Sequence, residues 1–281
     1  MKISMNLLLW TTHVTEEHWP LLGKLKAAGF DGVEIPIFEG DEKHYARLGS
    51  EMKKAGLAAT AVTVMSSENS PISDDPKIRQ AAKDRLKWAI ANAKAMGAEL
   101  LCGPIHSPLG VFSGTGPTDL EKGHCAEVLR AAANEADNAN LRLAVEYLNR
   151  FECYFLTSAA ETKALVKAID HPHCLAMYDT FHANIEEKNL LDAIKAMGDE
   201  MIHVHISEND RSTPGQGHVD WVSTFKGLKS IGYNGWLTIE AFGRSMPALA
   251  AATKIWRDMF SSPEEVYTKG LAFIRDMWAK A

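Results

Sequence analysis

The chain has 281 residues, of which 46% are hydrophobic and 23% are charged, and it carries a formal net charge of -6 at pH 7. A (β/α)8 barrel typically needs about 250 residues, so we expect residues 1–281 to form one catalytic domain rather than two small ones. The mild acidity and the lack of a Lys/Arg cluster argue against nucleic acid as a partner, and no apolar run approaches the ~20 residues of a membrane span.

The N-terminal residues MKISMNLLLWTTH contain a short apolar run that resembles a signal peptide. The segment has one lysine and no small-residue cleavage pattern, and a helix-like stretch follows at once, so we interpret it as part of the folded domain. The four cysteines are widely separated and form no CxxC pair, which argues against a disulfide framework. We therefore expect a reducing, cytoplasmic location.

Eight β-rich runs alternate along the chain with amphipathic helical stretches. The predicted strands are residues 3–10, 32–38, 58–65, 100–106, 142–148, 174–181, 201–207 and 236–242. The predicted helices include residues 18–29, 42–56 and 75–98, and in the last of these apolar residues recur at i, i+3 and i+4. Several helices are expected to end at a glycine, because glycine adopts the left-handed conformation of a helix cap; the candidates are Gly29, Gly56, Gly97 and Gly232.

Strict alternation of strand and helix requires a parallel sheet with helical crossovers, and eight repeats favour closure into a barrel. An open doubly wound sheet is the alternative, but it usually carries a glycine-rich phosphate loop after its first strand, and the TTHVTEEHW segment contains no glycine. We therefore predict an α/β fold, a (β/α)8 TIM barrel with an extra C-terminal helix over residues 263–281. The loops 66–75, 107–118 and 209–219 are expected to cap its catalytic face.

Three acids and one histidine lie at the ends of the last four strand-like runs. They are Glu146, Asp179, His205 and Glu240. In a parallel barrel those ends converge on the face where chemistry is done, and an unpaired buried carboxylate is too costly to be incidental. The four residues therefore predict a divalent metal site. The alternative is that the acids form ion pairs with Arg150, Arg211 or Arg244.

Three oxygen ligands and one imidazole suit Mn²⁺ best, with Mg²⁺ or Co²⁺ as possible substitutes, and zinc and iron also fit the same cage. Three carboxylates and one divalent cation leave the ligand set with a net charge of about -1, which favours a neutral polyol over an anion. We infer a sugar bound through two neighbouring oxygens. One carboxylate would support aldose–ketose isomerisation, whereas two on opposite faces, Glu146 and Glu240, would support epimerisation.

The same residues lie in four blocks that resemble the xylose-isomerase-like sugar isomerase/epimerase superfamily of TIM barrels. More narrowly they resemble its ketose 3-epimerases, the D-tagatose, D-psicose and L-ribulose 3-epimerase group. The blocks are VEYLNRFE with Glu146 and Glu152, YDTFHANIEE with Asp179 and His182, HVHISENDR with His205 and Arg211, and IEAF with Glu240.

The resemblance implies an isomerase that inverts C3 of a free ketose through a cis-enediolate. It implies that Glu146 and Glu240 transfer the proton as metal-bound catalytic residues, while Glu152, His182 and Arg211 hold the ketose oxygens near C1 to C3. It also implies a homodimer or homotetramer. The segments GPIHSPLGVFSGTG and STPGQGHVDW differ from the usual family loops and are expected to line the distal end of the sugar.

Other readings of these residues stay open. The cage also suits an aldose–ketose or hydroxypyruvate-type isomerase, or an epimerase or dehydratase acting on a 3-keto sugar derivative or inosose. A DNA endonuclease of the abasic-site type would need more zinc ligands and a basic face. A non-catalytic sugar-binding barrel would have lost a ligand.

Several side chains have a structural reading beside the functional one. Glu152 and Arg150 would form a surface ion pair, His182 would cap a helix, and Arg211 would be solvated. His203 lies on the same strand face as His205, so we expect it to support that residue rather than bind metal. Three more candidates for substrate contact or packing are Trp10, His106 and His218.

Overall fold

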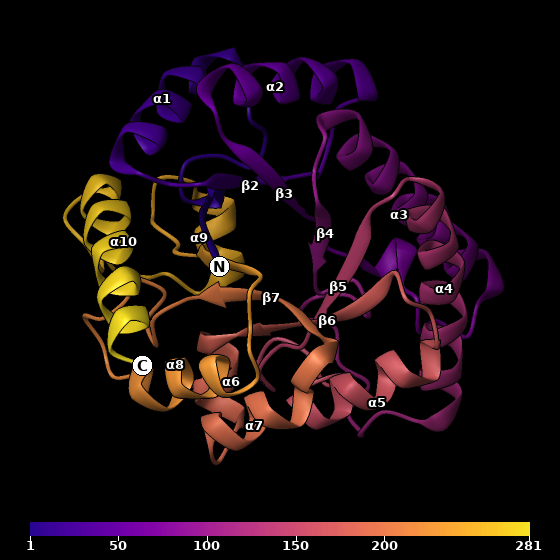
Figure 1. Ribbon diagram of the computed structural model, residues 1–281. Coiled ribbons are helices and arrows are strands. Elements are labelled where there is room, and N and C mark those ends of the chain that lie inside the picture. The colour runs from indigo at the N-terminus through magenta and orange to yellow at the C-terminus, as the bar shows by residue number, and fades with distance from the viewer.

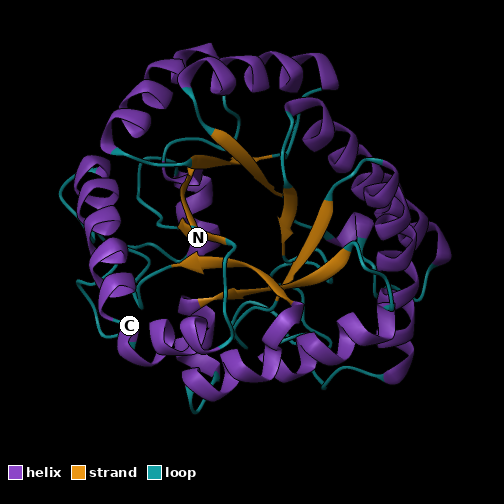
Figure 2. Cartoon of the chain, in the orientation of Figure 1, coloured by secondary structure: helices purple, strands orange, loops and turns teal.

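The computed structural model describes residues 1–281. Eight parallel strands close into a barrel in chain order, with β8 hydrogen-bonded to β1, and Figure 2 shows them as an inner ring surrounded by helices. The strands are β1 (Lys2–Asn6), β2 (Gly32–Pro36), β3 (Ala58–Val62), β4 (Leu100–Gly103), β5 (Arg142–Glu146), β6 (Cys174–Asp179), β7 (Met201–Ile206) and β8 (Trp236–Ile239). The predicted TIM barrel is confirmed.

Ten α-helices connect and cover the strands (Figure 1). They are α1 (Trp19–Ala28), α2 (Glu42–Ala55), α3 (Pro76–Met96), α4 (Asp119–Asn138), α5 (Ala159–Ile169), α6 (Thr180–Glu186), α7 (Leu190–Met197), α8 (Trp221–Ser230), α9 (Pro247–Thr253) and α10 (Pro263–Lys280). Short 3₁₀ turns occur at Leu7–Leu9, Glu16–His18, Ser67–Asn69 and Gly198–Glu200. None of these helices combines the length and apolar character that a membrane span requires.

The strands are shorter than the apolar runs that predicted them. The run 3–10 leaves the sheet at Asn6, whose side-chain oxygen accepts from the Leu8 backbone N–H at 2.8 Å and starts a 3₁₀ turn. The run 174–181 leaves the sheet at Asp179, which caps α6. Both residues are good helix-capping types, so their side chains end the strand where the active face begins.

Three of the four predicted glycine caps are confirmed. Gly29, Gly56 and Gly97 follow α1, α2 and α3 with φ of 107°, 73° and 79°, in the left-handed region. The prediction for Gly232 was off by one residue, because α8 ends at Ser230 with Ile231 as its cap. Gly232 follows with φ of 66° and its N–H donates to the Lys229 carbonyl at 3.0 Å.

The predicted C-terminal helix is present as α10 and lies between α1 and α8 in the outer ring (Figure 1). Tyr267 packs beside Trp10 with ring centroids 6.2 Å apart, and Phe273 packs edge-on against Trp221 at 5.3 Å. Helix α10 therefore covers the outside of the barrel where the last strand meets the first, and the short helices α6 and α9 lie in the connections that follow β6 and β8.

Side chains in the strands alternate between the barrel interior and the layer beneath the helices. In β8 this alternation places Trp236 and Thr238 on the interior face, and Glu240, directly after the strand, lies on the same side, where it contacts Asn6. An apolar cluster that includes Leu100, Met177 and Trp236 occupies the interior, separate from the larger core between strands and helices. The polar layer above it is where the functional residues lie.

Two of the loops expected to cap this face are tied down by specific contacts. Met65 and Pro108 form a parallel bridge that joins the loops after β3 and β4. In the loop after β7, the buried Glu208 carboxylate accepts from the Gly215 N–H at 2.7 Å and from the Trp221 indole at 3.0 Å. These loops therefore form ordered walls around the carboxyl ends of the strands.

Candidate metal centre and substrate pocket

The four predicted metal ligands meet at the carboxyl end of the barrel. His205 Nδ1 lies 3.3 Å from Glu240 Oε1, 3.5 Å from Asp179 Oδ2 and 3.9 Å from Glu146 Oε1. Their carriers are the consecutive strands β5, β6 and β7 and the residue directly after β8. All four residues are buried, so the polar atoms face one another rather than solvent.

Two of these atoms are buried without any hydrogen-bond partner, namely Asp179 Oδ2 and His205 Nδ1. Such orphaned atoms are costly unless something satisfies them. The other oxygen of Asp179 accepts from the Phe181 N–H at 2.6 Å and the His182 N–H at 3.3 Å, which aims Oδ2 into the cluster. A divalent cation bound among these atoms would satisfy both, so the donor set fits a metal ion.

The electrostatics also favour a cation here. Burial raises the pKa of Glu146 well above its usual range, with Glu240 and Asp179 adding to the rise and His205 opposing it. Burial by itself lowers the pKa of His205, but Glu34 and Glu240 raise it well above its usual range. The cluster thus stabilises positive charge, whether that charge is a proton on His205 or a metal ion.

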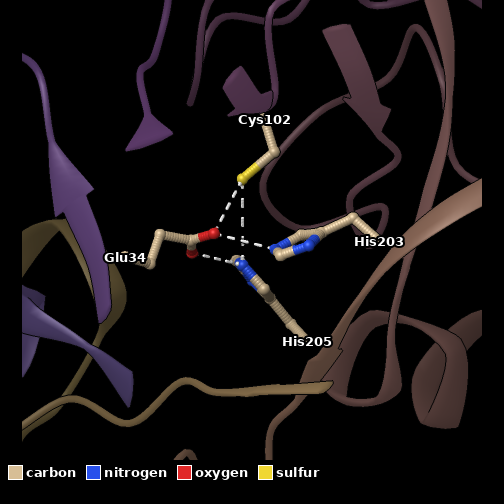
Figure 3. Close-up of side chains that lie close together, drawn as sticks. All are labelled: Glu34, Cys102, His203 and His205. Atoms are coloured by element: carbon tan, nitrogen blue, oxygen red, sulfur yellow. Dashed lines mark hydrogen bonds and ion pairs between the residues drawn. The ribbon is translucent and has the colours of Figure 1, made fainter. Parts of the chain in front are cut away.

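Beneath this cluster lies Glu34 of β2, a fully buried acid whose role the sequence analysis missed. Figure 3 shows its carboxylate facing His203, His205 and Cys102. Oε1 accepts from His205 Nε2 at 2.7 Å and Oε2 accepts from His203 Nε2 at 2.8 Å. Burial raises the pKa of Glu34, but the two imidazoles hold it well below its usual range. The signal was present, because Glu34 interrupts the apolar run GVEIPIF.

The three predicted substrate residues lie together beside the metal ligands. Arg211 Nη2 lies 3.2 Å from Glu152 Oε1 and 3.2 Å from His182 Nε2, and His182 Nε2 lies 3.7 Å from Glu146 Oε1. Arg211 is 4% exposed, which rules out the solvated alternative. Its guanidinium lies 4.1 Å from the Phe181 ring and 5.0 Å from the Phe242 ring, so two aromatic faces hold it.

His182 presents a fixed proton to this pocket. Its Nδ1 accepts from the Asn149 backbone N–H at 2.9 Å, so the neutral ring carries its proton on Nε2. Burial lowers the pKa of His182 to about 3, which keeps the ring neutral near pH 7. His182 lies within α6 rather than at its end, and its buried side chain faces Glu146, so it does not serve as a helix cap.

The alternative ion pairs do not involve the metal ligands. Arg150 pairs with Glu186 at 2.8 Å and Arg244 pairs with Asp258 at 3.2 Å. Glu152 pairs with Arg211 rather than with Arg150. The acids of the cluster are therefore available to hold a cation.

The other residues considered from the sequence differ in burial and in their contacts. His203 contacts Glu34, as expected for a residue that supports His205. His106 is fully buried, is hydrogen-bonded through Nδ1 to Ser107 at 2.8 Å, and has an unpartnered Nε2. His218 is exposed, and Trp10 packs against α10.

Comparison with known proteins agrees with this geometry. The sequence profile described as xylose isomerase-like TIM barrel matches residues 22–277. The chain is 30% identical to a probable ketose 3-epimerase of Synechocystis sp. over 99% of this chain and 97% of that protein. It is 30% identical to a ketose 3-epimerase of Arthrobacter globiformis over 98% of this chain and 96% of that one.

A crystal structure of the D-allulose 3-epimerase of Methylomonas sp. in complex with D-allulose superposes with a TM-score of 0.92 and 26% identity, covering 99% of this chain and 97% of that chain. The family profile spans most of the sequence, and the relatives align over almost their whole length. The chain belongs to the xylose isomerase-like TIM barrel family and, within it, to the ketose 3-epimerase group.

Proposed function

We propose that this protein is a metal-dependent isomerase that inverts C3 of a free ketose. The observation that carries the proposal is the meeting of His205 Nδ1 with three carboxylates from separate strands, two of which, Glu146 and Glu240, come from strands separated by two others. Two acids on opposite sides of one bound carbon are what inversion requires, because the proton must leave one face and return to the other.

Glu146, Asp179, His205 and Glu240 would hold the metal ion, and their three oxygens and one imidazole favour Mn²⁺, with Mg²⁺ or Co²⁺ as substitutes. When bound, a divalent ion acts as a Lewis acid that polarises the ketose oxygens and lowers the energy of an enediolate by several kcal/mol. The role of the protein is to place the four ligands and to keep the sugar oriented against them.

Proton transfer falls to Glu146 and Glu240. One carboxylate removes the C3 proton, leaving a cis-enediolate, and the acid on the opposite face supplies a proton to the same carbon.

Three residues orient the ketose. The Nε2–H of His182 points toward Glu146 and would donate to a sugar oxygen, and the charged Arg211 would donate to a second oxygen. Glu152, next to Arg211, would accept from a sugar hydroxyl. Together they fix C3 between the two acids, which is the geometric condition for catalysis.

The test is product analysis with metal-stripped protein. D-fructose, D-tagatose and L-ribulose are incubated in D₂O with and without Mn²⁺. We expect Mn²⁺-dependent formation of the C3 epimer with deuterium at C3. An aldose product labelled at another carbon would indicate an isomerase, and metal binding without turnover of any free ketose would indicate a modified or 3-keto sugar as substrate.

Three wider properties belong to the same proposal. We take residues 1–281 as one catalytic domain, and the four free, buried cysteines support a cytoplasmic location. Phe151 and Trp256, which are 72% and 69% exposed in the loops after β5 and β8, support association into a homodimer or homotetramer. Sedimentation velocity would measure that state directly.

A further inference from the structure

Glu34 is the acceptor for donors from four other strands of the barrel. Besides the two imidazoles of β7, its oxygens accept from Asn6 Nδ2 at 3.0 Å, from Thr60 Oγ1 at 2.9 Å and from Cys102 Sγ at 3.2 Å. Asn6, Glu34 and Thr60 are register partners on β1, β2 and β3, so they lie at one level of the barrel. The histidines reach Glu34 from the opposite side of the closed sheet (Figure 3).

This group of side chains resembles a second metal site in composition, but both oxygens of its only carboxylate are already supplied with hydrogen-bond donors. Both carboxylate oxygens of Glu34 receive donors, and the Nε2 atoms of His203 and His205 each donate to it at normal hydrogen-bond distances of 2.8 and 2.7 Å. In the upper cluster His205 Nδ1 and Asp179 Oδ2 lie 3.5 Å apart and both lack partners, whereas in the lower group only His203 Nδ1 does. Two facing unpartnered atoms fit a shared cation in the upper cluster, and the lower group is a network of hydrogen bonds around Glu34.

The contact with Glu34 determines which nitrogen of His205 can bind metal. Because Nε2 donates its proton to the carboxylate, Nδ1 carries the free lone pair and points at the three acids above. With the opposite tautomer, Nδ1 would carry a proton into the metal site and Nε2 would face Glu34 without a donor.

A second connection runs from Glu34 to Glu240 through Asn6. The Asn6 amide donates to Glu34 Oε1 at 3.0 Å and to Glu240 Oε1 at 3.1 Å. Its carbonyl oxygen accepts from the Leu8 N–H, which fixes the orientation of the amide. One buried acid therefore orients His205 directly and Glu240 through one side chain.

We propose that Glu34 is a positioning residue that sets the metal affinity of the site and the placement of Glu240 for proton transfer. This inference rests on the proposed function for its second half only, because metal binding can be measured without turnover. Residues of this kind typically change metal affinity by about 10–100-fold when altered.

The variant Glu34→Gln tests the inference, because the amide keeps the size of the side chain but can no longer accept from both imidazoles. We expect the Kd for Mn²⁺, measured by electron paramagnetic resonance of free Mn²⁺ in the absence of sugar, to rise about 10–100-fold. Circular dichroism of the metal-free form should stay unchanged, and Glu34→Asp should recover part of the affinity.

The control is Thr162→Val, which removes the hydrogen bond of a buried side chain to the Ser158 carbonyl at 2.8 Å in α5, away from Glu34 and its partners. Its Kd for Mn²⁺ should equal that of the parent. An unchanged Kd in Glu34→Gln would overturn the inference, as would binding of two ions by the parent and one by the variant, because Glu34 would then be a ligand.

A measurement on the parent protein covers the case in which Glu34→Gln does not fold. Nitrogen-15 NMR of the Mg²⁺-loaded protein should show His205 with its proton on Nε2, and a proton on Nδ1 would refute the positioning role. If the parent binds Mn²⁺ with the expected dependence on Glu34 but turns over no ketose, the proposed function fails while the metal half of the inference stands.

Discussion

Backbone N–H groups determine which atoms of Asp179 and His182 remain free in this site. The N–H groups at the start of α6 hold one oxygen of Asp179 and leave the other for a cation. The N–H of Asn149 donates to Nδ1 of His182 and leaves the proton of the neutral ring on Nε2, 3.7 Å from Glu146 Oε1. The first contact is a local helix cap and the second joins residues 33 apart in sequence, but each determines which atom of the side chain stays free.

The two-acid mechanism predicts that removal of the C3 proton and its return can be separated by mutating one acid at a time. In Glu146→Gln and in Glu240→Gln the epimerisation kcat should fall by about 10²–10⁴-fold, because each variant lacks one proton-transfer group. Each should still exchange the C3 proton of one epimer with solvent, and the two variants should act on opposite epimers. Proton NMR in D₂O would detect the exchange.

The control for that experiment is Glu186→Gln, which alters an acid paired with Arg150 outside the cluster. Its kcat should match the parent. Exchange of the same epimer by both catalytic variants would contradict the opposite placement of the two acids.

His106 predicts a specific dependence of stability on pH. Burial lowers its pKa from 6.5 to about 3, so between these values the unfolded chain binds a proton that the folded chain does not. Above pH 6.5 this residue therefore costs the folded state no stability. As the pH falls from 6.5 toward 3, the free energy of unfolding decreases by about 1.4 kcal/mol per pH unit.

In His106→Asn the slope of unfolding free energy against pH should decrease by about that amount, as measured by urea denaturation between pH 4.5 and 6.5. The exposed His218→Asn should leave the slope unchanged. An unaltered slope in His106→Asn would mean that the buried ring does not carry this acid sensitivity.

Helices and strands meet in this barrel through close contacts that local sequence does not reveal. Gly49 lies in the middle of α2, where its lack of a side chain lets the helix approach the C-terminal end of α3. Gly123 in α4 has nothing within 4 Å of the position where a Cβ would lie. A side chain is therefore excluded at Gly49 but not at Gly123, and only the neighbouring helix distinguishes the two positions.

We expect Gly49→Ala to destabilise the protein by about 1–3 kcal/mol, because the new methyl group would collide with the Met96 backbone carbonyl. Gly123→Ala should stabilise it by about 0.5–1 kcal/mol through helix propensity. Thermal unfolding of both variants would check the pair, and a stabilised Gly49→Ala would show that α2 and α3 can separate without cost.

The whole barrel contributes to the candidate metal site, because the four proposed ligands come from the last four strand ends and the residues that support them include Asn6 of β1 and Glu34 of β2. His205 and Glu34 are far apart in sequence, and only closure of the sheet brings β7 and β2 to the same interior layer. A bound ion would therefore link the second half of the barrel into one unit and stabilise the folded state over the unfolded one.

Metal removal should lower the thermal midpoint of the entire protein. At 100 times Kd a bound ligand adds about 2.7 kcal/mol, which for a chain of 281 residues corresponds to roughly 5 °C. Differential scanning calorimetry with Mn²⁺ and with EDTA would measure the shift. An identical midpoint in both would contradict a metal site in the four-residue cluster.

The alternation of strands and helices, the position of each proposed ligand at a strand end and the four motif blocks could all be read from the amino-acid sequence. These features are local, because period-two alternation and capping residues act over a few positions. The ends of the strands were less predictable, since Asn6 and Asp179 stop them by side-chain contacts inside otherwise apolar runs.

The partners of the buried polar groups, in contrast, depend on how the barrel closes. Arg211 looked like a loop residue, yet the fold places it between Phe181 and Phe242 and against Glu152. Glu34 lies inside an apolar strand run, yet barrel closure gives it five donors from four other strands. Such contacts join residues distant in sequence, and their energies depend on burial and geometry that exist only once the sheet has closed.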